Sequence, residues 1–161
     1  MTTSNLLTIG TEILAAAVAA LGARAPARQY VATGQVSFDG CDQITVSWGP
    51  NGLYPTSPFP GRRTEVTRCV VVPAAEFIVE CTRCVPVIEG DTMPDPTAIQ
   101  AAHAEILADA ETLFCALLAQ AEAGTLFGDR RLFSFGGATP YGPSGGLGGC
   151  RLPIVVQTSC P

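Results

Sequence analysis

Two cysteines three residues apart, Cys81 and Cys84, form the spacing in this chain that most directly suggests chemistry. A CxxC pair can hold a metal ion or carry out thiol–disulfide exchange. In an extended strand, however, residues three apart point to opposite faces, and a thioredoxin-type pair instead begins a helix. Val-Pro-Val and a spacer follow Cys84. We therefore predict structural thiols rather than a reactive or metal-binding pair.

His103 is the single histidine of the chain. A zinc site needs four closely placed ligands, commonly two CxxC or CxxC/HxxxH pairs, and this sequence has one CxxC and one histidine. The same histidine would also be the only base for a Cys-His or Ser-His-Asp nucleophile. We therefore expect His103 to lie on a helix face, with no metal and no catalytic residues.

A glycine tract and two glutamates complete the candidates for chemistry. The tract 136–149 leads into an apparent strand, whereas a phosphate-binding loop leads into the N-terminus of a helix. We interpret it as a flexible hairpin or arm. Glu76 and Glu80 are more typical of a solvated or interface face than of paired acid–base carboxylates. The sequence therefore predicts no enzyme and no cofactor.

The cysteine count bears on the redox environment. Seven cysteines cannot all pair, and a chain of this length can fold without disulfides. Free buried thiols and synthesis in the cytoplasm are the simplest interpretation. The seven are Cys41, Cys69, Cys81, Cys84, Cys115, Cys150 and Cys160.

Length and composition limit the class of protein. The 161 residues suit a single domain, 1–161, and 47% hydrophobic against 14% charged residues describes a globular chain. The absence of lysine excludes Schiff-base and P-loop lysine chemistry. The net charge of -5 disfavours nucleic-acid binding, since the only basic doublets are Arg62-Arg63 and Arg130-Arg131.

Two helices must position these residues. Apolar residues at helical spacing predict a first helix over 6–21 that ends at Gly22. No basic region precedes it and the uncharged stretch is short, so we expect neither a signal peptide nor a membrane span. A second helix begins after a cap at Asp95 or Thr97 and ends near Gly124.

Three acidic residues of the second helix, Glu105, Asp109 and Glu122, lie outside its apolar positions. We therefore expect them on its solvent face.

Alternation of apolar and polar residues predicts the strands. These strands lie at 36–38, 44–48, 66–72, 75–87 and 152–156. Asp39-Gly40 predicts a hairpin turn, Pro73 a turn or break, and Pro153 an edge position for the last strand. The whole pattern predicts an α+β fold, in which a small mixed or antiparallel β-sheet packs on two helices.

Two segments rich in proline and glycine, the loop 49–65 and the arm 136–149, should lack regular ladders. We expect residues 53–63 and 136–149 to be mobile in a free subunit and to become ordered against neighbouring subunits, because both carry large apolar side chains. The candidate subunit-interface residues are Leu53, Tyr54, Phe59, Arg62, Arg63, Tyr141 and Leu147.

The stretch 76–86, followed by a proline-rich spacer and a long alanine-rich helix, resembles the tail-terminator (tail-completion) proteins of long-tailed bacteriophages that infect actinobacteria. The stretch 41–46 resembles their first strand. The resemblance implies a structural virion protein without catalytic residues, made in the host cytoplasm and located at the head–tail junction.

The same resemblance implies partners. Copies of the chain would form a homo-oligomer, a hexameric ring, that caps the head-proximal end of the tail tube. The tail tube protein would lie on one side and a head-completion or connector protein on the other. Viral DNA would pass through without specific binding, and no membrane would be involved. Three alternatives stay open at this point: a neck adaptor ring, a thiol-dependent enzyme using Cys81 and Cys84, and a secreted disulfide-rich binding domain.

Overall fold

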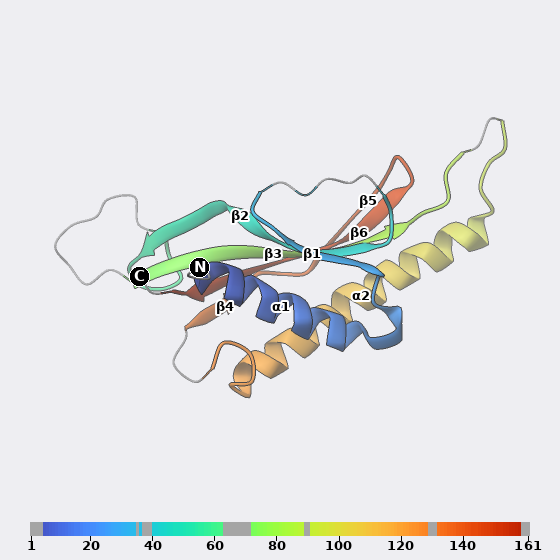
Figure 1. The fold of residues 1–161 in the computed structure, drawn as a ribbon. Coiled ribbons are helices and arrows are strands. Elements are labelled where there is room, and N and C mark those ends of the chain that lie inside the picture. Colours follow the sequence, from blue (N-terminus) through green and yellow to red (C-terminus); the bar gives the residue numbers. More distant parts are fainter. Residues whose placement is uncertain are drawn as a thin grey trace.

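The computed structural model describes residues 5–34, 36, 40–62, 72–88, 91–128 and 132–158. Its elements are α1 (Asn5–Leu21), a short 3₁₀ turn (Gly22–Arg24), β1 (Arg28–Ala32), β2 (Gln43–Thr56), β3 (Val72–Cys84), α2 (Pro96–Glu122), β4 (Phe133–Phe135), β5 (Thr139–Ser144) and β6 (Leu147–Gln157). Both helices cover one face of a six-stranded sheet (Figure 1). The predicted α+β fold, a mixed sheet packed on two helices, is confirmed.

The sheet has the strand order β1-β2-β3-β6-β4, and β5 pairs with β6 beside β4. All pairs are antiparallel except β1 with β2, which run parallel. The hairpin expected between the strand 36–38 and β2 is wrong, because residues 43–47 of β2 already pair with β1 on one side and with β3 on the other. Asp39 itself, like residues 37–38 of the expected strand, lies outside the described residues.

The core lies between the sheet and the helices. α1 turns Ile9, Ile13 and Leu21 inward, as its spacing predicts, and Gly22 with φ 57° follows its last residue. A left-handed φ of this kind suits glycine at the end of a helix. The sheet contributes alternate residues of β3, such as Phe77 and Val79, to the same core.

Residues Asn5–Arg24 are long and apolar enough to cross a membrane by length and composition alone. The core helix of a soluble protein and an N-terminal signal sequence meet the same criterion. In this fold the apolar side chains of α1 pack against the sheet.

The expectation that 49–65 has no regular structure is wrong for its first part, because β2 continues to Thr56. A register shift between Trp48 and Leu53 accommodates the extra residues. Pro55 lies opposite Pro73, whose carbonyl accepts a hydrogen bond from Thr158 on the other side of β3. The two prolines lack backbone N–H groups, but the β2–β3 ladder does not use those groups at this position. The ladder therefore stays intact, and Pro73 does not break the strand. Residues 63–65, like 66–71 of the expected strand, lie outside the described part.

The arm 136–149 does form the expected hairpin, but it has ladders of its own. β5 pairs with the first half of β6, and the chain turns at Gly145-Gly146, both with positive φ. Pro153 is not on an edge strand, because β6 lies between β3 on one side and β4 and β5 on the other. Pro153 is tolerated because it falls between the stretches of β6 that pair with β4 and β5, where its carbonyl accepts from Gly136.

Candidate functional site

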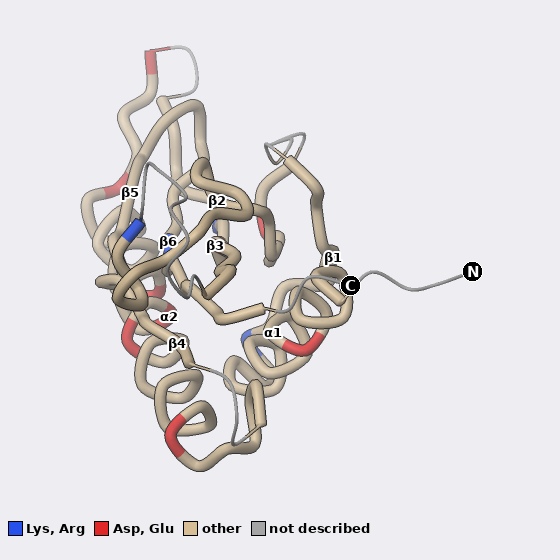
Figure 2. Tube along the Cα trace, turned by 90° about the vertical axis from the view of Figure 1, so that its left-hand side faces the viewer, with Lys and Arg blue, Asp and Glu red and all other residues tan. Residues whose placement is uncertain are grey.

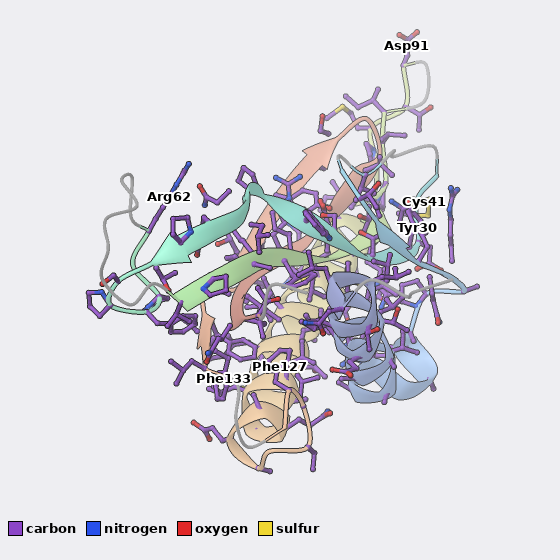
Figure 3. All side chains as sticks on the ribbon, turned by 60° about the vertical axis from the view of Figure 1, so that its left-hand side comes forward. Tyr30, Cys41, Arg62, Asp91, Phe127 and Phe133 are labelled. Carbon is purple, nitrogen blue, oxygen red and sulfur yellow. A yellow bond between two sulfur atoms is a disulfide. The ribbon has the colours of Figure 1, made fainter. Side chains whose placement is uncertain are left out.

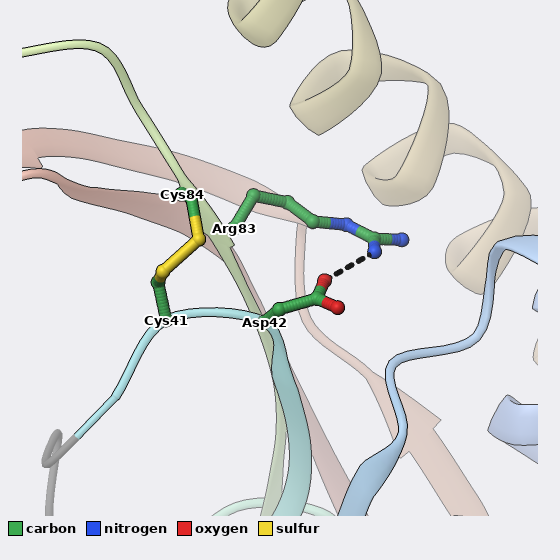
Figure 4. The surroundings of a disulfide bond; sticks show 4 residues. All are labelled: Cys41, Asp42, Arg83 and Cys84. Atoms are coloured by element: carbon green, nitrogen blue, oxygen red, sulfur yellow. Dashed lines mark hydrogen bonds and ion pairs between the residues drawn. A yellow bond between two sulfur atoms is a disulfide. The ribbon is translucent and has the colours of Figure 1, made fainter.

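A disulfide joins Cys41 to Cys84 (Figure 4). It lies just beyond the Gln43–Thr82 pair, at the end of the β2–β3 ladder. The prediction of free thiols is therefore wrong for these two residues: an odd count of cysteines does not prevent one pair from forming. Cys81, in contrast, is a free buried thiol, so Cys81 and Cys84 do point to opposite faces as expected.

The other cysteines differ in exposure. Cys150 is free and buried, as predicted, whereas the free thiol of Cys115 is exposed on α2. Cys69 and Cys160 lie outside the described residues.

Next to the disulfide, Asp109 of α2 is fully buried, and the prediction of a solvent-facing residue is wrong. Its Oδ2 accepts from Arg83 Nε at 2.7 Å and its Oδ1 from Arg24 Nη1 at 2.6 Å. Arg83 also donates from Nη1 to Asp42 Oδ1 at 2.8 Å (Figure 4). Four chain segments are thus joined by one ion-pair cluster. Periodicity within α2 could not reveal this, because the partners of Asp109 come from elsewhere in the chain.

The two buried thiols lie on adjacent strands beside this cluster. Cys81 of β3 lies opposite Cys150 of β6 in the strand register, and both thiols are free. The Cys81 Sγ lies 3.7 Å from Asp109 Oδ2. Burial raises the pKa of Cys81 well above its usual range; Arg83 opposes this shift only in part. Burial also raises the pKa of Cys150 to about 12. Both thiols are therefore protonated at neutral pH and are poor nucleophiles.

The opposite face of the sheet carries a polar cluster at the β5–β6 hairpin. The hydroxyls of Thr82 and Tyr141 lie 3.0 Å apart, and Arg151 Nε donates to Glu80 Oε1 at 3.0 Å. The Arg151 guanidinium also lies over the Tyr141 ring, 5.2 Å from its centre. Burial raises the pKa of Tyr141, with a smaller contribution from Glu80. These groups satisfy one another.

Glu76 and Glu80 do not form an acid–base pair. Glu80 is buried against Arg151, which contradicts a solvated position. Glu76 Oε2 accepts from both the backbone and the side-chain nitrogen of Asn51, at 3.0 and 2.8 Å. Over the described residues, no group of three or more His, Cys, Asp and Glu side chains is arranged to hold a metal ion.

His103 lies on the exposed side of α2, at the edge of a shallow hollow of about 260 Å³. The lining residues come from the first half of α2 and from β5: His103, Ile106, Leu107, Pro140, Tyr141 and Gly142. The lining is therefore mainly apolar, with the imidazole of His103 at its edge.

The predicted interface residues fall at two opposite ends of the molecule. At one end, Leu53 and Arg62 are exposed, Phe59 is half-buried, and Tyr54 is buried within the chain's own fold. Figure 3 shows Arg62 there. Arg63 lies outside the described residues.

At the other end, Tyr141 and Leu147 are partly buried in the β5–β6 hairpin. The loop that follows β3 passes this hairpin, because Val85 N donates to Gly146 O at 2.8 Å. Figure 3 shows Asp91 at the tip of that loop, far from Arg62.

Large exposed apolar side chains gather at these same two ends. We call one the arginine end, defined by Leu53, Arg62 and Leu132. We call the other the acidic end, defined by Val87, Ile88, Asp91, Met93, Asp95 and Leu107. Figure 2 shows acidic residues on both helices and on the loop before α2. Sequence periodicity did not indicate the acidic end, since its residues come from a loop and from the outer side of a helix.

No protein-family model matches this chain, and no curated protein sequence is significantly similar to it. The case for a function is therefore made from the geometry above together with the resemblance noted in the sequence.

Proposed function

We propose that this chain is a structural virion protein, the subunit of a ring that caps the head-proximal end of a phage tail tube and joins it to the head connector. The observation that carries the proposal is the placement of exposed apolar side chains at two opposite ends of one subunit. Met93 is 73% exposed at the acidic end and Leu53 is 50% exposed at the arginine end.

Contiguous exposed apolar groups are typical of surfaces that another protein covers. Two different surfaces on opposite ends favour a heterologous contact, in which each copy uses one surface toward each neighbour. Such contacts generate a ring when the rotation between copies closes. The order of segments that resembles tail terminators points to the same kind of assembly.

The alternative of a thiol-dependent enzyme that uses Cys81 and Cys84 receives no support from these two residues. Burial raises the pKa of both Cys81 and Cys150, and Cys84 is held in a disulfide with Cys41. A chemical role would need a thiolate that is accessible to substrate. These cysteines instead contribute to the packing and cross-linking of the sheet.

The test is a reconstruction of the particle that contains this chain. We expect density for a closed ring of this fold between the tail tube and the head connector. Particles that lack the chain should accumulate as separate heads and tails. Density on the head side of the neck would favour the neck adaptor alternative, and density anywhere else in the particle would contradict a role at the head–tail junction.

A further inference from the structure

We propose that the acidic end of one copy docks on the arginine end of a second copy, so that the two ends are the halves of a single head-to-tail interface. This inference deepens the proposed function and rests on it for the closure of the ring. It names the surfaces that neighbouring copies use and the direction in which they join.

The acidic end offers an apolar hollow on α2 and acidic groups at and before the N-terminus of the same helix. Leu107, which is 57% exposed, lines the hollow between α2 and β5. Val87 lies against the turn of the β5–β6 hairpin, where a Cβ on Gly146 would meet its Cγ1 at 3.2 Å. Asp91 lies on the loop before α2 and Asp95 caps the start of α2; both are exposed, and among the described residues neither forms an ion pair.

The arginine end offers an exposed leucine and a cation. Leu53 projects from the last part of β2, where it pairs with Ala75 of β3. Arg62 bridges back to Thr56 of the same strand and donates from Nη1 to Asn51 Oδ1 at 2.9 Å. Its partner is a neutral amide that also donates to Glu76, so Arg62 makes no direct ion pair with a carboxylate among the described residues. Arg24, Arg83 and Arg151, in contrast, each pair with a carboxylate of the same chain.

The two ends are complementary in shape and in charge. A hollow of about 260 Å³ can receive the Leu53 side chain, while Arg62 faces the carboxylates at the start of α2 and on the loop before it. Because both halves are present on one chain, a second copy is the partner that satisfies them. Complementary potentials of this kind set register and partner choice.

The first test uses two variants that each block one end. Leu53→Asp blocks the arginine end and Leu107→Asp the acidic end; both positions are exposed, so the monomer should fold. Analytical ultracentrifugation of the wild-type chain should show self-association that grows with concentration. Each variant alone should associate about 30-fold more weakly or worse, as expected for a leucine at the centre of an interface. Ala15→Asp, on the exposed side of α1, is the matched control and should associate like the wild type.

Mixing the two variants decides whether the interface is head-to-tail. The mixture retains one intact interface, between the acidic end of Leu53→Asp and the arginine end of Leu107→Asp. We expect heterodimers with wild-type affinity and no larger species. A wild-type chain that stays monomeric up to about 1 mM, variants that associate like the control, or a mixture that stays monomeric would each overturn the inference.

The second test reverses the charges. Arg62→Glu and Asp91→Arg should each weaken association, and an equimolar mixture of the two should restore it, because every contact then joins opposite charges. Asp91 is substituted rather than Asp95, because Asp95 caps α2 and its replacement would also remove the cap. No recovery in the mixture would show that these charges do not face each other.

The particle reconstruction separates this inference from the proposed function. A ring at the head–tail junction whose copies touch through other surfaces would contradict the inference and leave the function standing. A chain found elsewhere in the particle would contradict the function, whatever the ultracentrifugation shows. Variants that self-associate normally but no longer bind the tail tube would assign these ends to a different partner and overturn the inference.

Discussion

Asp109 shows how much depends on a single buried charge. Removing a carboxylate from water is costly, and here two arginine donors compensate for the loss. One of them, Arg24, is 40% exposed at its side chain, so only part of the cluster is shielded from solvent. The cluster holds α2 against β3 near the disulfide.

We predict that Asp109→Asn lowers the free energy of unfolding by about 3 kcal/mol, because it leaves Arg83 buried with one carboxylate fewer. Urea denaturation followed by circular dichroism measures the change. Glu105→Gln is the matched control, since Glu105 lies 3.6 Å from Arg83 but is about half exposed. That control should cost less than about 1 kcal/mol. Equal effects of the two variants would contradict the role assigned to Asp109.

The free thiols should react very differently. With its pKa raised to about 12, Cys150 is ionised in only about one molecule in ten thousand at pH 8, and Cys81 is protected in the same direction. Cys115 is exposed. Iodoacetamide followed by peptide mapping should therefore label Cys115 in the native protein, and Cys81 and Cys150 only after unfolding. Rapid labelling of Cys81 in the native protein would contradict this protection and support the alternative of a thiol-dependent enzyme.

The same raised pKa predicts loss of stability at alkaline pH. The thiol of the unfolded chain ionises near 9.0, whereas the folded chain keeps the Cys150 proton until about pH 12. Unfolding therefore releases a proton between these values, and the contribution to stability that is complete below pH 9 falls as the pH rises. Denaturation midpoints between pH 8 and 11 measure the slope. Cys150→Ala should reduce that slope, and an unchanged slope would contradict the assignment.

Among the elements, β3 organises the molecule. It pairs with β2 and β6 along nearly its whole length and contributes Phe77 and Val79 to the core on one face. Its last residue carries the disulfide, and the residue before it carries the ion-pair cluster. The end of one strand thus ties the start of β2 to a helix.

We predict that Cys84→Ser lowers the free energy of unfolding under oxidising conditions by about 4 kcal/mol, because the disulfide closes a loop with a sequence separation of 43. Urea denaturation with and without a dithiol reductant measures it. The reductant should lower the stability of the wild type but not that of the variant. Cys115→Ser, which removes an exposed free thiol, should leave stability unchanged. A wild type insensitive to the reductant would contradict a stabilising disulfide.

At the scale of the whole molecule, the chain is elongated along one axis (Figure 1). The chain carries a net charge of -5, and exposed apolar residues mark its two ends. Joined in a ring, such subunits would bury their apolar ends and present an acidic assembly to the DNA that must pass through.

We predict that the purified protein does not retard double-stranded DNA in an electrophoretic mobility assay at about 150 mM salt, because binding to phosphates requires clustered basic side chains. A basic DNA-binding domain in parallel lanes is the positive control. A stable complex at this salt would contradict passage without specific binding.

The amino-acid sequence by itself determined the local elements. Periodicity predicted α1 and α2 nearly to the residue, and alternation predicted strands within β2, β3 and β6, because both patterns depend on which side of an element meets water. The opposed directions of Cys81 and Cys84 followed from the same geometry.

Only the tertiary structure decided what joins residues far apart in the chain. The Cys41–Cys84 disulfide spans 43 residues, and Asp109 is buried because Arg83 and Arg24 reach it from other segments. Pro55 of β2 and Pro153 of β6 stay in strands because no neighbouring strand requires a backbone N–H donor at these positions. Each outcome depends on which strands become neighbours, and local patterns carry no information about that choice.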